Sequence, residues 1–239
     1  MKNTAKNKLF KPALDPKDLK FAIIAADAAL WTVADGQLLI RLVSVNVPPY
    51  FNNKAGLPGG LILPTEVNAE QSVKRLLRDK AGVIDSKVYL EQLYTFSDIN
   101  RDPRGRVVAL AYTGIVPWDR LSTRERENSA DSWWQNVKKL PSMAYDHKEI
   151  IATALDRLKT KAAYTTIVAQ FMPKEFTLTE LEQAYELILD KDIDKRNFRK
   201  KILSLGILKD TGKERRGGKF RPAKLYAFRS LNVEVIEVL

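Results

Sequence analysis

The sequence contains no cysteine and a single histidine, His147, among its 239 residues. Without cysteine the chain can form no disulfide and offers no thiolate to a metal. One imidazole also excludes a zinc site built from several histidines. No apolar run approaches the ~20 residues that a membrane-spanning helix needs, and no apolar segment follows the basic N-terminus as in a secretory signal. We therefore expect a cytoplasmic protein without a structural metal.

Acidic residues are scarce in one part of the chain only. Between Lys195 and Arg229 there are 13 lysines and arginines but two acids, Asp210 and Glu214, whereas the remaining 204 residues carry 27 basic and 27 acidic side chains. The whole formal charge of +11 thus belongs to one segment. Positive charge concentrated in this way is typical of a surface that binds a polyanion, and nucleic acid is the first candidate.

The first part of the chain mixes strand and helix patterns. Residues 21–47 contain two apolar segments around an Ala-Asp-Gly turn at 34–36, which predicts a hairpin. Further strands are expected over 88–96 and 106–116, and the apolar spacing over 67–81 is helical. This interleaving predicts a mixed α/β domain.

From residue 146 the pattern becomes helical. Apolar residues at helical spacing predict a connecting helix over 146–163 and a second helix over 166–172. Thr177, with a glutamate three residues later, has the spacing of a capping box and begins a third helix. Asp194 can cap a fourth helix, which ends at Gly206.

Two short strands, 207–212 and 223–229, follow these helices and are joined by the basic loop KERRGGKFRP. Helices followed by a basic hairpin describe a winged helix-turn-helix. We therefore expect a tail over 1–19, an α/β domain over 20–145, a connecting helix over 146–163 and a winged helix-turn-helix domain over 164–239.

The fourth helix has two chemically different faces. Phe198, Ile202 and Leu205 recur at helical spacing and are expected to face the core. The outer face is basic, as in a helix that enters the major groove, where arginine pairs with guanine and asparagine with adenine. A solvated helix face has a similar composition, but the hairpin repeats the positive charge and favours DNA binding. The candidate DNA-binding residues are Thr177, Thr179, Lys195, Arg196, Asn197, Arg199, Lys200, Arg215, Arg216, Lys219 and Arg221.

Residues 57–83, LPGGLILPTEVNAEQSVKRLLRDKAGV, resemble the Nudix box. In that motif a loop, a helix and a loop gather carboxylates around magnesium, which polarises a pyrophosphate and activates water. Gly60 and Glu66 match its opening. The end of the motif matches at Arg75, Leu77, Gly82 and Val83 if one residue is inserted.

The acidic part of this motif is depleted. According to where the insertion is placed, the first helix carboxylate is replaced by Leu76 or Arg75. The carboxylate pair becomes Asp79-Lys80 or Arg78-Asp79. One acid of three survives, so we expect no metal site, no catalytic residue and little or no pyrophosphate hydrolysis.

The combination resembles the Nudix-related transcriptional regulator (NrtR) family. KEFTLTELEQAYELIL, DIDKRNFRKKILSLGIL and GGKFRPAKLYAF are similar to its DNA-binding domain in order and spacing, and the resemblance extends from about Lys20 to Arg229. It implies a Nudix-like α/β sandwich, a mixed sheet between helices, followed by an α+β winged helix-turn-helix domain. It also implies a dimeric repressor of NAD-synthesis genes, or in some branches of sugar-catabolism genes. In the NAD branch, ADP-ribose in the Nudix-like domain weakens binding to the operator, which we expect to be palindromic.

The arginine-rich segment 100–107, NRDPRGRV, is the candidate effector site, because guanidinium groups bind diphosphates bidentately. A salt-bridged loop that ties the domain together is the alternative. We expect His147 to form a capping or interdomain hydrogen bond, and Trp133 and Trp134 to pack. The candidate effector-binding residues are Lys54, Gly59, Gly60, Arg101, Asp102, Arg104 and Arg106.

Three other functions fit the sequence. The first is an ADP-ribose pyrophosphatase with unusual metal ligands such as Glu66 and Glu70. The second is the same kind of regulator responding to a sugar such as arabinose, although the arginines of 100–107 favour a phosphorylated ligand. The third is a nucleic-acid binder without sequence preference.

Overall fold

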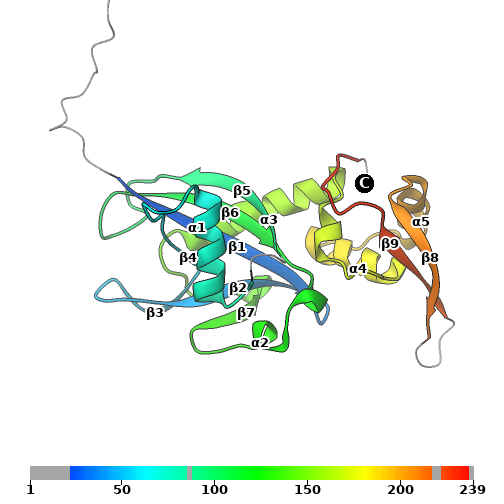
Figure 1. The fold of residues 1–239 in the computed structure, drawn as a ribbon, viewed down its shortest axis with the longest axis horizontal. Helices are drawn as coiled ribbons and strands as arrows, with labels where there is room; N and C mark the ends of the chain where they lie inside the picture. The colour runs from blue at the N-terminus through cyan, green and yellow to red at the C-terminus, as the bar shows by residue number, and fades with distance from the viewer. Residues whose placement is uncertain (1–21, 85–87, 217–221, 237–239) are drawn as a thin grey trace, which may run out of the picture.

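The computed structural model describes residues 22–84, 88–216 and 222–236. A mixed sheet with helices on both faces forms its larger part, and a helical part with a two-stranded hairpin follows (Figure 1). The strands of the sheet are β1 (Ile23–Ala34), β2 (Gln37–Val47), β3 (Phe51–Gly56), β4 (Gly59–Leu61), β5 (Tyr89–Phe96), β6 (Val107–Ile115) and β7 (Ser132–Asn136).

Strand β1 is the centre of this sheet. The order is β3-β2-β1-β6-β5, with β4 paired to β1 and β7 paired to β2. β1 runs parallel to β6 and antiparallel to β2. At the predicted turn between β1 and β2, Asp35 and Gly36 both have positive φ, 49° and 67°, as a two-residue type I′ turn requires. The predicted strands over 88–96 and 106–116 are confirmed as β5 and β6.

Helices bury both faces of β1. Trp31 belongs to the apolar core that includes α3 (His147–Tyr164), whereas Leu30 belongs to the core that includes α1 (Ala69–Leu76). Successive residues of a strand point to opposite faces, so a strand covered on both sides is apolar almost throughout. The segment AALW within β1 meets this requirement, and all four of its residues are fully buried.

The predicted helix over 67–81 consists of two kinds of helical turn. It begins at Ala69 as α1 and continues from Leu77 as a π-helix, η2 (Leu77–Ala81). A π-turn closes hydrogen bonds between residues five apart instead of four, so it takes one more residue than an α-turn. A π-turn is therefore a natural place for the residue inserted in the Nudix pattern, and an insertion there puts Arg75 at the position of the first helix carboxylate.

The chain between β6 and α3 contains short helices around β7. These are η4 (Trp118–Arg120), α2 (Thr123–Arg126) and η5 (Val137–Lys139). Trp134 on β7 is buried, and its Nε1 donates a hydrogen bond to the Glu125 carbonyl at 2.9 Å. Trp133 is half-buried against the core that includes α3. The predicted packing role of both tryptophans is confirmed.

After α3 the chain forms η6 (Ile167–Phe171), α4 (Leu178–Leu189), α5 (Lys195–Ser204), β8 (Leu208–Arg215) and β9 (Ala223–Phe228). Two details differ from the sequence prediction. The segment expected as a helix over 166–172 is a single 3₁₀ stretch, because Pro173 leaves no room for a longer one. β8 continues to Arg215, which pairs with Ala223, so Lys213 and Arg215 lie on a strand and not in the predicted loop.

The predicted helix caps are present. The Thr177 hydroxyl accepts from the Glu180 amide at 3.2 Å, and the Glu180 carboxylate accepts from the Thr177 amide at 2.8 Å. The Asp194 carboxylate accepts from the first-turn amides of α5 at 3.0 Å. Gly206, with φ of 67°, follows the end of α5. The predicted capping box and the predicted start and end of α5 are therefore confirmed.

One apolar core crosses from the sheet into the helical part. It contains Trp31 of β1, Ile151 of α3 and Tyr185 of α4, all essentially inaccessible to solvent. α3 lies under the sheet at its first turns and reaches α4 at its last (Figure 1). Within the described ranges no helix is long and apolar enough to cross a membrane.

Candidate functional site

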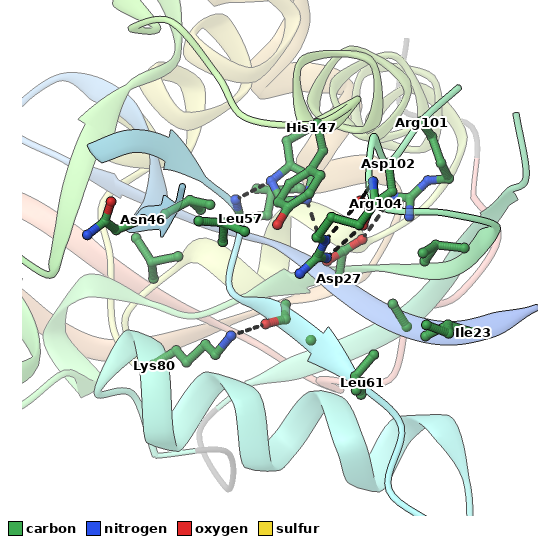
Figure 2. A pocket seen from close by; sticks show the side chains of 18 of the residues that line it. Ile23, Asp27, Asn46, Leu57, Leu61, Lys80, Arg101, Asp102, Arg104 and His147 are labelled. Carbon is green, nitrogen blue, oxygen red and sulfur yellow. Dashed lines mark hydrogen bonds and ion pairs between the residues drawn. The ribbon is translucent and has the colours of Figure 1, made fainter. Parts of the chain in front are cut away.

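A cavity of about 780 Å³ opens beside β1, β2 and β4 (Figure 2). Its walls come from the two strand segments around Asp27 and Asn46, the β4 glycines, the end of helix η2 and the loop between β5 and β6. Tyr145 and His147, at the beginning of α3, complete it. This volume is in the usual range for a small-molecule site.

Five of the seven predicted effector-binding residues line this cavity. They are Gly59, Gly60, Arg101, Asp102 and Arg104. Lys54 and Arg106 lie elsewhere: the Lys54 ammonium donates to the Ser142 hydroxyl at 3.0 Å, and the Arg106 carbonyl accepts from the Ile23 amide at 2.9 Å. A side chain at Gly59 would place its Cβ 1.8 Å from an Asp27 oxygen, so only glycine fits there.

Arg101 is the buried centre of an ion-pair network. Its Nε and Nη2 donate to the two carboxylate oxygens of Asp146 at 2.8 Å, and Nη2 also lies 3.3 Å from Asp27. Its side chain is 3% exposed. Arg101 thus makes the contacts of the alternative interpretation, a salt bridge that ties the loop to the domain. Both partners hold the guanidinium in the cavity wall.

Asp27 and His147 extend this network to α3. The Asp27 carboxylate lies 3.6 Å from His147 Nε2, and His147 Nδ1 accepts from the Leu57 amide at 2.9 Å. Burial opposes ionisation of Asp27, but the neighbouring His147 and Arg101 outweigh it and hold the pKa of this carboxyl below its usual range. His147 forms a hydrogen bond, as predicted, but to the cavity wall; it does not cap α3.

The Arg104 guanidinium is fixed by a carboxylate and is also exposed to solvent. It donates to both carboxylate oxygens of Asp102, at 2.9 and 2.7 Å, and its Cζ lies 5.4 Å from the centre of the Tyr145 ring. The side chain is 47% exposed, whereas that of Asp102 is 3% exposed. A guanidinium oriented by a buried carboxylate and open to a cavity is suited to binding an anionic group.

The acids of the Nudix pattern are paired with cations. Glu66 receives a 2.6 Å hydrogen bond from Arg75, and this contact lowers its pKa to about 2. Glu70 pairs with Lys74 at 2.6 Å. Among the described residues there is no group of three or more His, Cys, Asp or Glu side chains placed to hold a metal. With Glu66 bonded to Arg75 and Glu70 to Lys74, these residues do not fit a magnesium ion.

Lys80 lines the cavity but is not among the predicted effector-binding residues. Its ammonium donates to the Gly59 carbonyl at 2.6 Å, from the π-helix across to β4 (Figure 2). Asp27, Tyr145 and His147 also line the cavity without having been predicted as effector-binding residues. The signal for Lys80 was its place in the Nudix pattern; no local signal marked Asp27 and Tyr145.

The basic helix α5 forms a second candidate surface. Phe198 and Ile202 are buried as predicted, and Leu205 is half-buried. The side chains exposed on its outer face are Lys195, Arg196, Asn197 and Lys200.

Lys195 also lies 3.2 Å from the buried Glu182 of α4. The Arg199 guanidinium turns back to the same helix. There it donates to the Thr179 hydroxyl at 3.0 Å and lies 3.4 Å from the buried Glu182. The Thr177 side chain is used as the cap of α4 and is itself buried.

The hairpin of β8 and β9 contributes the remaining basic residues. Lys213 donates to Glu175 at 2.8 Å, and Arg215 pairs with Glu180. Arg216 is exposed. Lys219 and Arg221 lie outside the described residues.

Comparison with known proteins decides the family. Residues 168–228 match the family model of the NrtR DNA-binding winged helix domain. The ADPR responsive transcriptional repressor NtrR of Acinetobacter baylyi is 32% identical over 229 residues, which cover 95% of this chain and 90% of that protein. The chain belongs to the NrtR family.

Two solved structures of Shewanella oneidensis NrtR extend this comparison. The NrtR complexed with a 27mer DNA is 34% identical, with a TM-score of 0.76 over 86% of this chain and 93% of that one. The Nudix domain complexed with ADP ribose is also 34% identical, with a TM-score of 0.50 over 61% of this chain and 94% of that one. The predicted fold class and the regulator class are confirmed: this NrtR-family chain joins a Nudix-like domain to a winged helix.

Proposed function

We propose that this protein is a transcriptional repressor that releases its operator when ADP-ribose occupies the cavity. The observation that carries the proposal is the presence, in one chain, of a basic winged helix and a Nudix-like cavity whose acids are paired with cations. The relative from Acinetobacter is named for its response to ADP-ribose, which supports this choice of effector. Its target genes are proposed to be those of NAD metabolism, as the family resemblance implies.

Recognition of the effector is assigned to the exposed part of the cavity wall. Arg104 faces the opening and provides the paired donors that a diphosphate accepts. The Tyr145 ring, beside this guanidinium, offers an apolar surface. Arg101 is buried, and its Nε and Nη2 are bonded to Asp146 and Asp27, so the role proposed for it is to hold the wall and not to contact the effector directly.

The same residues support binding without hydrolysis. Nudix chemistry needs a metal held by several carboxylates, because the ion polarises the phosphate and activates water. Here Glu66 is bonded to Arg75, and Glu70 to Lys74. We therefore propose that this protein is a sensor and not a pyrophosphatase.

A route from the cavity to the DNA-binding part runs through α3. Arg101, three residues before Arg104, is bonded to Asp146, the residue directly before α3. The far end of this helix shares a core with α4. A movement of the 101–105 loop on effector binding would therefore reposition α3 and the winged helix after it. We keep the division at 20–145, 146–163 and 164–239 as part of this proposal.

DNA binding is assigned to a dimer. Two copies of α5 would enter the major groove of a palindromic operator at half-sites one helical turn, or a multiple of it, apart. The exposed cations of α5 and Arg216 provide phosphate and base contacts. Such a regulator acts in the cytoplasm, on the nucleoid when bound.

The proposal is tested by titrating ADP-ribose into the purified protein in a calorimeter, with magnesium present. The solution in the calorimeter cell is then assayed for AMP. Saturable binding without AMP is the expected result. Release of AMP would identify an enzyme instead. No binding would exclude ADP-ribose and direct the search to sugars such as arabinose, while the DNA-binding assignment would stand.

A further inference from the structure

Lys80 stands where the Nudix pattern has an acid. Counting back from Gly82, which closes the pattern, the paired carboxylates correspond to Asp79 and Lys80. Both residues line the cavity, but Asp79 is half-exposed and lies 3.7 Å from Arg78. A cation has therefore replaced one of the two acids that face the cavity in the pattern.

The Lys80 side chain lines the cavity from the π-helix and is exposed there. The π-helix changes the direction in which this side chain leaves the helix, and the ammonium reaches the Gly59 carbonyl at 2.6 Å. A neutral carbonyl positions the charge without cancelling it. The neighbouring Gly60 leaves space, because a Cβ there would already lie 3.4 Å from the Lys80 nitrogen.

The charges around the cavity favour an anion beside the Lys80 ammonium. Burial lowers the pKa of Lys80; Asp27 opposes that shift, while the positive charges of Arg75 and Arg104 add to it. The Asp27 carboxylate is already engaged by Arg101. An anion between Lys80 and Arg104 would relieve the repulsion of these two cations.

We propose that Lys80 replaces the divalent cation of the Nudix site: its ammonium and the Arg104 guanidinium together bind the effector's diphosphate, so that binding requires no metal. This inference rests on the proposed ADP-ribose site and names the residues that hold the charged part of the ligand. An ammonium neutralises a diphosphate as a point charge. It does not supply the metal-bound water that hydrolysis in a Nudix site needs, so binding would leave the effector intact.

The first experiment compares ADP-ribose binding by the full chain in EDTA and in magnesium. The dissociation constant from calorimetry should be the same in both buffers. Binding that disappears in EDTA and returns with magnesium would overturn the proposal, although ADP-ribose would remain the effector.

The second experiment uses variants of Lys80. Lys80→Met should weaken ADP-ribose binding about ten- to hundredfold, as expected for the loss of one hydrogen bond between charged groups. Lys80→Arg should retain most of the affinity, since it keeps the charge. Lys74→Met is the matched control, because Lys74 lies on the adjoining helix α1 but pairs with Glu70 and does not line the cavity. Wild-type affinity in Lys80→Met would contradict the proposal.

Two controls keep these outcomes distinct. Thermal melting of each variant shows whether a loss of binding reflects unfolding, and a folded Lys80→Arg that binds ADP-ribose answers the same question. If the wild-type protein binds no ADP-ribose in either buffer, the proposed effector is wrong, and inorganic pyrophosphate becomes the probe. Pyrophosphate binding that Lys80→Met abolishes would still support the anion site, whereas no pyrophosphate binding would overturn it.

Discussion

Arg101 and Arg104 lie three residues apart in one loop, yet their surroundings give them different roles. Arg101 is buried between Asp27 and Asp146, whereas Arg104 is half-exposed and bonded to the neighbouring Asp102. Removal of one partner from a buried ion pair leaves an uncompensated charge and is strongly destabilising. Removal of an exposed partner has little effect on stability, because solvent screens the charge.

These environments predict that one alanine substitution lowers stability and that the other weakens ADP-ribose binding. Arg101→Ala should lower the free energy of unfolding by ~3–5 kcal/mol, because Asp27 is left buried without its guanidinium partner. Arg104→Ala should change it by ~1 kcal/mol or less but weaken ADP-ribose binding about ten- to hundredfold. Denaturant unfolding and calorimetry measure the two quantities. A variant Arg101→Ala as stable as the wild type would show that the buried network is not formed in solution.

Glu182 is another buried charged residue and lies below the candidate DNA-binding helix α5. Its carboxylate is inaccessible to solvent, receives no hydrogen bond from any residue that the structure describes, and lies 3.2 Å from Lys195 and 3.4 Å from Arg199. A carboxylate in this position competes with DNA phosphates for both cations.

Replacement of this carboxylate should therefore strengthen the electrostatic part of DNA binding. Glu182→Gln should raise affinity for random and operator DNA alike and steepen the plot of log affinity against log salt by about one unit. Fluorescence anisotropy over a salt series measures both. An unchanged slope would mean that Lys195 and Arg199 do not exchange Glu182 for phosphate. Glu186→Gln, one turn further along α4 where the carboxylate accepts from the Ile193 amide at 3.2 Å, is the control.

At the scale of helices and strands, most elements were predictable because their signals are local. The β1–β2 turn, the capping box of α4 and the cap of α5 each depend on residues within four positions of one another. The pairing of β4 with β1 and of β7 with β2 was not predictable in this way. The same holds for the cavity, where Arg101 meets Asp27 from 74 positions away. Such contacts depend on the tertiary fold, and no spacing in the sequence marks them.

The cap of α5 gives a prediction for an element as a whole. Asp194→Ala should destabilise the protein by ~1 kcal/mol, because two first-turn amides lose their acceptor. It should also weaken DNA binding, since the same turn carries Lys195 and Arg196. Thermal unfolding and anisotropy report the two effects. Asp192→Ala, an exposed acid before the helix, should change neither, and equal effects of both substitutions would contradict the capping role.

The contact between α1 and the loop before it gives a prediction about acid. Arg75 lowers the pKa of Glu66 from 4.5 to about 2, so the folded protein holds this carboxylate ionised more strongly than the unfolded chain. Its contribution to stability is therefore present above pH 4.5 and is lost as the pH falls toward 2. Arg75→Met should remove this part of the acid dependence of stability. Denaturant midpoints measured between pH 5 and pH 2, the range that contains both pKa values, would show the loss. Identical pH profiles for variant and wild type would argue against the pair.

For the molecule as a whole, the shared apolar core is the feature that joins sensing to DNA binding. Residues of β1, α3 and α4 form one cluster, and Lys138 of η5 pairs with Asp190 at the end of α4. The charge distribution had already assigned the polyanion surface to Lys195–Arg229, and the resemblance had assigned the fold. Neither indicated that the cavity wall is bonded to the first turn of α3. Through this connection a change at the cavity can reach the winged helix, and linkage requires that the effect act in both directions.

The most direct test of this account measures that coupling. A fluorescent operator duplex, selected by the protein itself from random-sequence DNA, is titrated with protein at increasing ADP-ribose concentrations. We predict that saturating ADP-ribose weakens operator binding about 5- to 150-fold, and that saturating operator weakens ADP-ribose binding by the same factor. Operator affinity that stays constant while ADP-ribose binds would contradict the account.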